Sequence, residues 1–405
     1  MATRRAGVLV VSMLAAVMML APVARSAPGV GLTWQASSLD LPLAWQVTSG
    51  SATSVVAVVD SGVQADNPAL QGRVLAGYDF VHGDTNTTDD NGHGTAVAGI
   101  IAAVCPGCSI LPVKVLDANG TGDWPTISAG IDWAADHGAQ VINLSVGAPR
   151  ALDIVGAAVA YAISKGAIVV AAAGNDGEDE SFYPAMYPGV ISVAGVDQTG
   201  ARSTWSNFGS WVTVAAPGCA TTASLQGGDT TDFCGTSAAA PFVAGLAGLA
   251  RAFEPNLDGT AFAAALRASG GSLPDPTTAA AGLPDANRLL VTLGAPVAPP
   301  TESSPPTVTS TPAVGRCSTA SAGKWGGTSA YKITWQRTRS GAGWTNVTSG
   351  TRYTPRARDA GYRLRVLVTA TNVRGTVTEA SQPTLPVRVL RRTSSRTPKN
   401  RYAQK

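Results

Sequence analysis

The sequence predicts two folded regions, an α/β domain built on a parallel sheet flanked by helices and a C-terminal all-β domain. Residues 55–59 and 168–173 are continuous apolar runs, which is typical of strands buried on both faces of a parallel sheet. Residues 238–252 are rich in small apolar side chains and predict a helix. In residues 362–371, apolar and polar side chains alternate, which predicts a strand with one buried face.

The first 27 residues have the composition of a secretory signal peptide. Two arginines precede an apolar stretch at residues 7–21, and a small-residue region follows at residues 24–26. We therefore expect cleavage after Ser26 or Ala27, a secreted or cell-surface associated protein, and no integral membrane segment after cleavage. The alternative is an uncleaved anchor, although the stretch is short for a membrane span of about 20 residues.

Three short blocks each carry one candidate catalytic side chain. Asp60 follows the strand predicted at residues 55–59, at the carboxyl end where open α/β sheets place their sites. His93 lies between two glycines, directly before a small-residue run that predicts a helix. Ser237 opens the helix predicted at residues 238–252, and the N-terminal dipole of that helix favours negative charge near the serine oxygen.

The order of these blocks points to serine-protease chemistry. A serine hydroxyl needs a histidine to take its proton, and a buried carboxylate must hold that histidine in one tautomer. One such block alone usually has no catalytic role, but Asp60, His93 and Ser237 stand in one order, 33 and then 144 residues apart. Over residues 32–290 the chain therefore resembles the subtilisin-like serine proteases, or subtilases.

The resemblance implies both a fold and a reaction. It implies a subtilisin-like parallel sheet flanked by helices at residues 28–294, and a secreted endopeptidase that acts on polypeptides through an acyl-enzyme. Ser237 would attack the peptide bond, His93 would act as general base and then as general acid, and Asp60 would orient His93. The alternative from another class is a catalytically silent surface-binding protein that acts through its C-terminal domain.

Asn175 is the fourth candidate catalytic residue. It follows the apolar run at residues 168–173, in a segment that resembles the one carrying the oxyanion asparagine of subtilases. The resemblance implies that its side-chain N–H stabilises the tetrahedral intermediate together with the backbone N–H of Ser237. The alternative is an asparagine chosen only for a left-handed turn.

The substrate contacts also come from the resemblance. An extended peptide would add as a strand between two rims, and small side chains would leave open the pocket for the residue before the scissile bond. The residues so assigned are Gly120, Thr121 and Gly122 on one rim, Ser145, Val146 and Gly147 on the other, and Ala172, Ala173 and Gly174 in the pocket.

Export permits disulfides, and four of the five cysteines form two plausible pairs. Cys219 and Cys234 flank the polar loop that leads to the Ser237 block. Cys105 and Cys108 would close a tight turn, although a CxxC pair is also compatible with a redox site or half of a zinc site. Cys317 is left over, and any partner would belong to another molecule.

No cofactor or metal is expected. In subtilases, the strongest calcium site uses an aspartate soon after the first catalytic block and a loop after the histidine helix. Here Ala69 and residues 105–108 occupy those places, so the resemblance implies no calcium at that site. Residues 32–45 resemble the mature N-terminal segment of the family, which leaves no room for a propeptide. Either the enzyme folds without that chaperone or part of its control lies elsewhere.

The region after residue 294 has a different composition. Residues 295–312 are rich in proline, serine and threonine, which predicts an extended linker. Residues 313–390 contain strand patterns and resemble the immunoglobulin-like β-sandwich modules of bacterial surface proteins, but a single cysteine excludes the inter-sheet disulfide of antibody domains. Residues 391–405 predict a basic, disordered tail. A binding or spacer role follows for this region.

The net charge of +3 conceals a strong asymmetry. Residues 28–312 contain 8 Lys and Arg against 24 Asp and Glu, whereas residues 313–405 contain 18 against 2. The opposite charges predict either contact between the two regions at low salt or binding of the basic region to an anionic partner, such as cell-wall polymer, nucleic acid or a membrane surface. The alternative is that both are merely solvated surfaces.

Overall fold

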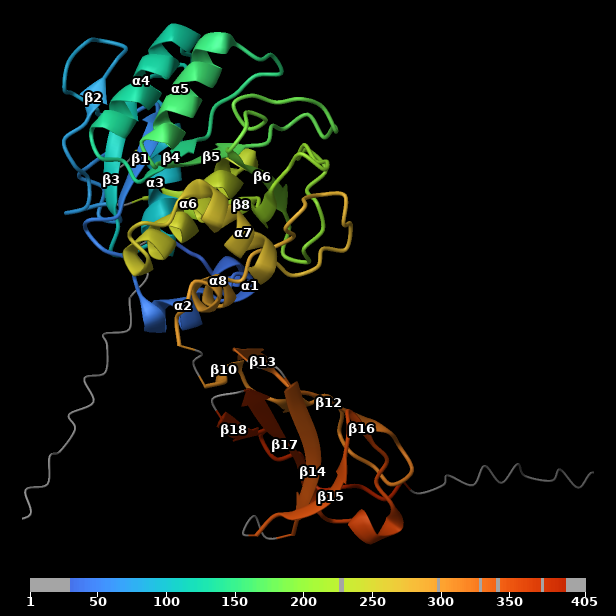
Figure 1. Cartoon of the computed structure of the whole chain (residues 1–405). Coiled ribbons are helices and arrows are strands. Elements are labelled where there is room, and N and C mark those ends of the chain that lie inside the picture. Colours follow the sequence, from blue (N-terminus) through green and yellow to red (C-terminus); the bar gives the residue numbers. More distant parts are fainter. Residues whose placement is uncertain are drawn as a thin grey trace, which may run out of the picture.

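The computed structural model of the chain describes residues 30–390 except 226–228, 297–298, 328–329, 340–342 and 373–374. The predicted signal peptide at residues 1–27 and the predicted tail at residues 391–405 lie outside the described residues. Figure 1 shows two parts. We refer to residues 30–294 as the α/β domain and to residues 301–390 as the C-terminal module.

The α/β domain is built on a seven-stranded sheet with the strand order β2-β3-β1-β4-β5-β6-β7. All of its described strand pairings are parallel, as the apolar runs at residues 55–59 and 168–173 predict. The strands are β1 (Val55–Asp60), β2 (Tyr78–Asp79), β3 (Ser109–Lys114), β4 (Val141–Leu144), β5 (Ile168–Ala172), β6 (Ile191–Val196) and β7 (Val214–Pro217).

Helices cover both faces of this sheet (Figure 1). Successive side chains of a strand point to opposite faces, so Val56 and Val58 pack with α3 and α6, whereas Ala57 and Val59 pack with α4 and α5. A two-stranded hairpin, β8 (Cys219–Ala223) and β9 (Thr230–Cys234), leads into α6. The helices are α1 (Trp34–Ser38), α2 (Leu41–Val47), α3 (His93–Val104), α4 (Trp124–Asp136), α5 (Asp153–Ser164), α6 (Thr236–Phe253), α7 (Gly259–Ser269) and α8 (Ala286–Thr292).

Helix α6 is buried along most of its length. Glycine lets it approach α3 closely, because a Cβ atom on Gly245 would lie 2.6 Å from Val104. Among the described residues, α6 is the one helix long and apolar enough to cross a membrane, and 83% of it is buried inside the protein. It is therefore a core helix of the α/β domain.

The strand order positions the candidate site. Strand β1 lies between β3 and β4. After β1 the chain adds β2 and β3 on one side of it, and then adds β4 to β7 on the other side. Sites in open parallel sheets form where the order reverses, beside the carboxyl ends of the strands. Because the strands are parallel, the segments that follow β1, β4 and β5 all emerge at this edge.

The C-terminal module consists of antiparallel strands around a small apolar core. Strands β15-β14-β17-β18 form one sheet, β11-β12-β16 form another, and β10-β13 form a two-stranded ribbon. Trp335 of β14 is fully buried between side chains of both larger sheets. The strands are β10 (Thr301–Ser304), β11 (Thr307–Val308), β12 (Ser318–Ser321), β13 (Lys324–Gly326), β14 (Ala330–Thr338), β15 (Thr345–Ser349), β16 (Arg352–Tyr353), β17 (Arg363–Asn372) and β18 (Gly375–Ala380), with a 3-10 turn, η1, at Ala357–Asp359.

Two sequence expectations for this region have different outcomes. The alternation predicted at residues 362–371 is present, because Leu364, Val366, Val368 and Ala370 are all buried. The linker expected at residues 295–312 is partly strand, since β10 pairs with β13 and β11 pairs with β12. Threonine and valine favour paired extended backbone, so these residues join the module where partner strands are available.

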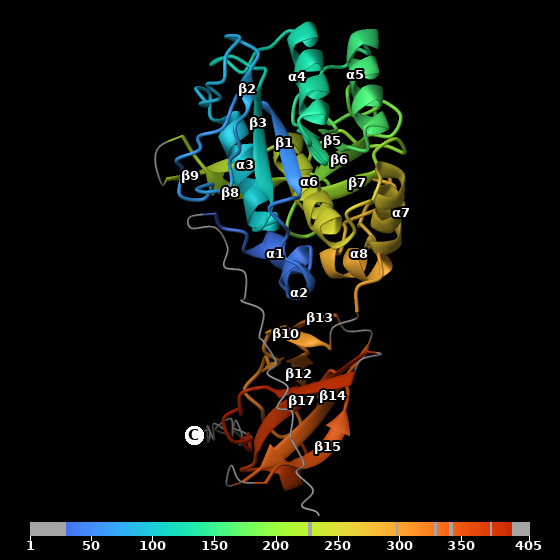
Figure 2. The ribbon, with the colours of Figure 1, turned by 60° about the vertical axis from the view of Figure 1, so that its left-hand side comes forward.

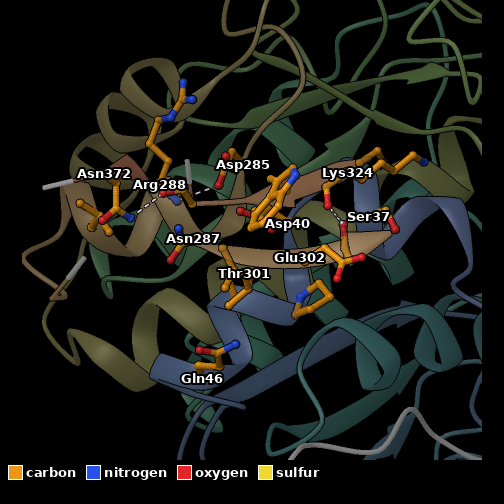
Figure 3. Close-up of a pocket in the computed structure, with 18 of the residues that line it drawn as sticks. Ser37, Asp40, Gln46, Asp285, Asn287, Arg288, Thr301, Glu302, Lys324 and Asn372 are labelled. Carbon is orange, nitrogen blue, oxygen red and sulfur yellow. Dashed lines mark hydrogen bonds between the residues drawn. The ribbon is translucent and has the colours of Figure 1, made fainter. Parts of the chain in front are cut away.

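The β10–β13 ribbon lies against α2 of the α/β domain (Figures 1 and 2). A Cβ atom on Gly326 would lie 2.6 Å from the Leu43 side chain and 2.7 Å from the Asp40 carboxylate, so the two parts touch closely here. A cavity of about 910 Å³ opens beside this contact, between the N-terminal helices, α8 and the ribbon (Figure 3). None of its lining residues belongs to the predicted catalytic set.

Asp40 is the most perturbed carboxylate at this contact. Burial raises the pKa of Asp40 to about 6, and the negative charge of Asp285 adds to the effect. The backbone N–H of Gly327 and the charge of Arg288 act in the opposite direction. Protonation of Asp40 therefore lowers the free-energy cost of its burial at the contact between the two parts.

Candidate active site

Asp60 and His93 form a hydrogen-bonded pair at the carboxyl end of β1. The His93 Nδ1 atom lies 2.8 Å from Asp60 Oδ1 and 3.0 Å from Oδ2. Asp60 is fully buried and also accepts a hydrogen bond of 2.8 Å from the Ser61 backbone N–H. Because a carboxylate only accepts, Nδ1 donates its proton to Asp60, and Nε2 of His93 is left as the basic nitrogen.

The surroundings of His93 favour its protonated form. Burial alone lowers the pKa of His93, but the charge of Asp60 and the hydrogen bond to it outweigh this effect and hold the pKa above its ordinary value. Asp89 contributes in the same direction. Phe233 packs edge-on against the imidazole at 5.2 Å between ring centroids. His93 is therefore a stronger base than a free imidazole.

Asp89 holds the loop that carries His93, a role that its position in the sequence does not predict. Its buried carboxylate accepts from Ser61 Oγ at 2.9 Å and from the backbone N–H of Gly92 at 2.9 Å. It also accepts from the backbone N–H and the hydroxyl of Thr95, at 2.9 and 2.6 Å. These bonds fix the end of β1 to the start of α3, where a negative charge suits the helix dipole.

Lys114 is a second residue at this edge of the sheet that no motif in the sequence indicates. It ends β3 beside Asp60 in the sheet register, and its side chain is only 1% exposed. Its Nζ atom donates to the carbonyl oxygens of Ser61 and Leu116, both at 2.8 Å, and pairs with Asp90 Oδ1 at 2.6 Å. Lys114 thereby ties together the ends of β1 and β3 and the loop before His93.

Ser237 lies in the first turn of α6, on the same edge of the sheet. Its Oγ atom donates to the backbone carbonyl of Ser145 at 3.1 Å, and the Ser145 hydroxyl donates back to the Ser237 carbonyl at 3.1 Å. Within the described residues, no hydrogen bond joins Ser237 to His93. Deprotonation of Ser237 by His93 would therefore require the hydroxyl to turn from the Ser145 carbonyl toward His93.

Asn175 holds its side-chain oxygen against the start of α6. Its Oδ1 atom accepts from the backbone N–H of Thr236 at 2.8 Å and from the Thr236 hydroxyl at 3.0 Å. Since both Thr236 groups need an acceptor, the oxygen faces the protein and the Nδ2 donors remain available next to Ser237. Gly174, with φ +103°, and Gly235, with φ +132°, provide the backbone turns that make this approach possible.

Six of the predicted substrate residues border one cavity of about 480 Å³, which also touches His93. Gly120, Thr121 and Gly122 lie on one side, and Ser145, Val146 and Gly147 lie on the other. The predicted pocket residues are not part of its lining. Ala172, Ala173 and Gly174 are buried at the end of β5, and a Cβ on Gly174 would lie 2.4 Å from Asn207.

Both predicted disulfides are present. Cys219–Cys234 joins β8 to β9, one residue before the Gly235 turn that leads to Ser237. Cys105–Cys108 closes the turn between α3 and β3. Cys317 is free and exposed. The described residues contain no cluster of three or more His, Cys, Asp or Glu suited to a metal, and the absence of the family's strong calcium site stays a prediction.

Comparisons with known proteins identify the family of this chain. The model of the subtilase family matches residues 51–284, which is more than half of the chain. The thermophilic serine proteinase of Bacillus sp. (strain AK1) is 46% identical over 216 residues, 51% of this chain and 54% of that protein. Thermitase of Thermoactinomyces vulgaris is 44% identical over 221 residues, 52% of this chain and 79% of that protein. The chain thus spans about half the length of the first relative.

Solved structures show the same fold. A cold-adapted subtilisin-like serine proteinase superposes with a TM-score of 0.53 at 33% identity, covering 58% of this chain and 88% of the other. A lanthipeptide protease superposes with a TM-score of 0.61 at 27% identity, covering 64% and 94%. From the family match over residues 51–284 and the subtilisin-like sheet, the chain belongs to the subtilase family of serine proteinases.

Proposed function

We propose that the protein is a secreted serine endopeptidase in which Asp60, His93, Ser237 and Asn175 perform the chemistry. The observation that carries this proposal is the buried Asp60–His93 pair, which leaves Nε2 as a base on the same sheet edge as Ser237. The two disulfides fit an extracellular location. Its substrates are polypeptides.

In the first half of the reaction, Ser237 Oγ forms a bond to the carbonyl carbon of the scissile peptide while its proton passes to His93 Nε2. The electron pair of the carbonyl moves to the oxygen, where the Nδ2 donors of Asn175 and the N–H of Ser237 stabilise the charge. The tetrahedral intermediate then expels the amine, which takes the proton from His93. An acyl-enzyme remains on Ser237.

In the second half, water replaces the amine. His93 takes a proton from the water, whose oxygen attacks the acyl carbon, and Ser237 Oγ leaves with that proton. Throughout, Asp60 keeps the same imidazole tautomer and stabilises the positive charge that His93 acquires in each half. The site is built so that the buried carboxylate has the imidazole as its principal partner.

The substrate lies in the cavity between the two rims. Residues 120–122 and 145–147 are spaced to pair with an extended peptide that passes His93. We assign the side chain before the scissile bond to the region of Ala172, Ala173 and Gly174 because the resemblance to subtilases implies it, although these residues are buried and do not line this cavity.

The regions outside the catalytic site have proposed roles in export and in attachment. A signal peptide at residues 1–27 directs export, and residues 28–294 form the protease domain. Residues 313–390 form an immunoglobulin-like β-sandwich, supported by two antiparallel sheets around Trp335. With the tail at residues 391–405, this region attaches the enzyme to a polyanionic surface such as a cell wall, because it holds 18 Lys and Arg against 2 Asp and Glu.

A serine-directed fluorophosphonate probe tests the catalytic proposal. The wild-type protein is expected to be labelled and to hydrolyse peptides, and Ser237→Ala is expected to lose both, leaving a rate only about 1000- to 10000-fold above that in water. Ser164→Ala is a matched control, because it removes an exposed hydroxyl on α5, outside the site, and should leave both labelling and hydrolysis unchanged. A wild-type chain that ignores the probe would instead support the catalytically silent alternative.

A further inference from the structure

Arginines gather at one end of the C-terminal module. Backbone hydrogen bonds tie together three segments, since Gly315 N donates to Pro355 O at 2.9 Å, Val314 N to Arg388 O at 2.9 Å, and Gly361 N to Val387 O at 3.0 Å. These segments carry the exposed side chains of Arg316, Arg356, Arg358, Arg363 and Arg388. We refer to this region as the arginine end.

Two further arginines, at the end of β14 and directly after it, extend the arginine end. The guanidinium groups of Arg337 and Arg339 stack on the Tyr362 ring, at 4.9 and 4.7 Å from its centroid. The residue between them, Thr338, is the sheet partner of Arg363. The arginine end is therefore one continuous surface and not a set of scattered cations.

Among the described residues of the arginine end, one acid, Asp359, lies beside the seven arginines. Asp359 is fully buried, forms an ion pair with Arg337, and accepts from the Tyr353 hydroxyl at 2.6 Å and from the Arg356 backbone N–H at 2.7 Å. Its charge is thus used within the module. No carboxylate among the described residues forms an ion pair with any of the six other arginines.

The arginine end faces away from the acidic α/β domain. Asn372, the last residue of β17, lines the cavity between the two parts, whereas Arg363 is the first residue of the same strand. Nine residues of strand separate them by about 30 Å. Figures 1 and 2 agree, with β10 and β13 beside the α/β domain and β15 at the far end of the module. The acidic α/β domain is therefore too far away to neutralise these arginines, and they remain available to another anionic partner.

The residue types indicate the chemistry of that partner. All seven cations are arginines, whose planar forks bind phosphate oxygens in pairs and lose less hydration than lysine does. Single-stranded nucleic acid also needs exposed rings on which bases stack. Here Tyr353 is buried, Tyr362 is covered by two guanidiniums and Trp344 by Arg365 at 4.2 Å. A chain of phosphates without bases fits this surface better.

We propose that the arginine end binds a linear poly(alkyl phosphate) chain, a polymer of repeated phosphodiesters without bases. The proposal rests on the polyanion-binding role given to residues 313–405 in the proposed function and names its partner and its surface. Several phosphates of one chain neutralise arginines that otherwise repel one another, and release their counterions on binding. Residues 391–405, which follow Leu390 directly, add six Lys and Arg and no acid.

The test uses the full-length Ser237→Ala protein and fluorescently labelled poly(glycerol phosphate), with anisotropy measured from 50 to 200 mM NaCl. The triple variant Arg356→Gln, Arg358→Gln, Arg363→Gln is expected to bind at least about 10-fold more weakly, with a salt slope lower by about 3. Lysine at the same three positions keeps the charge but loses the fork, so an intermediate affinity is expected.

Matched variants and ligands keep the proposal falsifiable. Arg358→Gln should weaken binding, whereas Lys332→Gln, which removes one exposed charge elsewhere in the module, should not. A chain ending at residue 390 should still bind. Unchanged affinity in the triple variant, or loss of binding only on removal of the tail, would overturn the assignment.

Two competing polymers separate this inference from the broader one. Tighter binding of poly(dT), or equal binding of polyglutamate, would overturn the phosphodiester assignment but leave a polyanion-binding role standing. Failure to bind any of the three polymers would sink both. Neither result bears on catalysis, because binding is measured on protein that cannot turn over substrate.

Discussion

Asp60 in the α/β domain and Asp359 in the C-terminal module are both fully buried carboxylates, but they have different partners. Asp359 is paired with the permanent cation of Arg337, which cancels its charge. Asp60 has no Lys or Arg partner among the described residues, and its neighbour is the titratable His93. A buried charge without a permanent counterion is costly, and in the proposed mechanism it lies where a positive charge on His93 must appear and disappear.

The largest expected effect is the loss of activity when the charge of Asp60 is removed. Asp60→Asn keeps the shape of the side chain but offers a donor where Nδ1 of His93 needs an acceptor, so kcat should fall by about 10000-fold. Steady-state hydrolysis of a chromogenic peptide measures this. Asp359→Asn is the matched control and should leave kcat and KM unchanged. A similar loss of activity in both variants would mean that the two carboxylates do not differ in role.

The second prediction concerns the free energy of unfolding, which we expect to depend on Asp359. Asp359→Asn leaves Arg337 without its counterion, and because that guanidinium is 23% exposed we expect a cost of about 2 to 3 kcal/mol, somewhat below that of a fully buried pair. Amide hydrogen exchange of strand β17 (Arg363–Asn372), followed as a function of denaturant, measures the effect on the module. The double variant Arg337→Met, Asp359→Asn should recover part of the loss, and no recovery would indicate that the pairing is not the cause.

The smallest effect concerns Asp40, a third and only partly buried carboxylate. Its folded pKa of about 6 lies above its ordinary value of 3.8, so the stabilising contribution of the protonated acid is complete below pH 3.8 and is lost as pH rises through 6. Asp40→Asn imitates the protonated form. It should raise the melting temperature at pH 8 by about 1 to 3 °C and leave it unchanged at pH 4.

Glu302→Gln is the control for this comparison, since Glu302 lines the same cavity but is exposed. Glu302→Gln should leave the melting temperature nearly unchanged at both pH 4 and pH 8. A gain at pH 8 from both variants would mean that reduced net charge, and not burial of Asp40 against the ribbon, is responsible.

The sequence predicted the residues whose chemistry is visible in short blocks. Asp60 and His93 could be paired from their order along the chain, and the apolar runs at residues 55–59 and 168–173 identified two strands because burial on both faces demands such composition. Asp89 and Lys114 could not be found in this way. An acid in a polar loop and a lysine at the end of a strand look solvent-exposed until the fold brings their partners from distant segments.

The boundary of the C-terminal module shows a second limit. Residues 295–312 have the composition of a linker, yet β10 and β11 are paired strands within them. Composition reports the intrinsic preference of a segment, whereas strand pairing depends on an available edge, which β12 and β13 supply. The cavity beside Asp40 was equally unpredictable, because its walls come from both ends of the chain.

The burial of α6 bears on how long the enzyme survives at high temperature. Ser237 sits in the first turn of a helix that packs against the sheet and α3 along most of its length. Fraying of a surface loop therefore cannot displace Ser237, since moving α6 opens the main core. We therefore expect displacement of Ser237 on heating to coincide with opening of the main core, so that the rate of this opening limits how long Ser237 keeps its place.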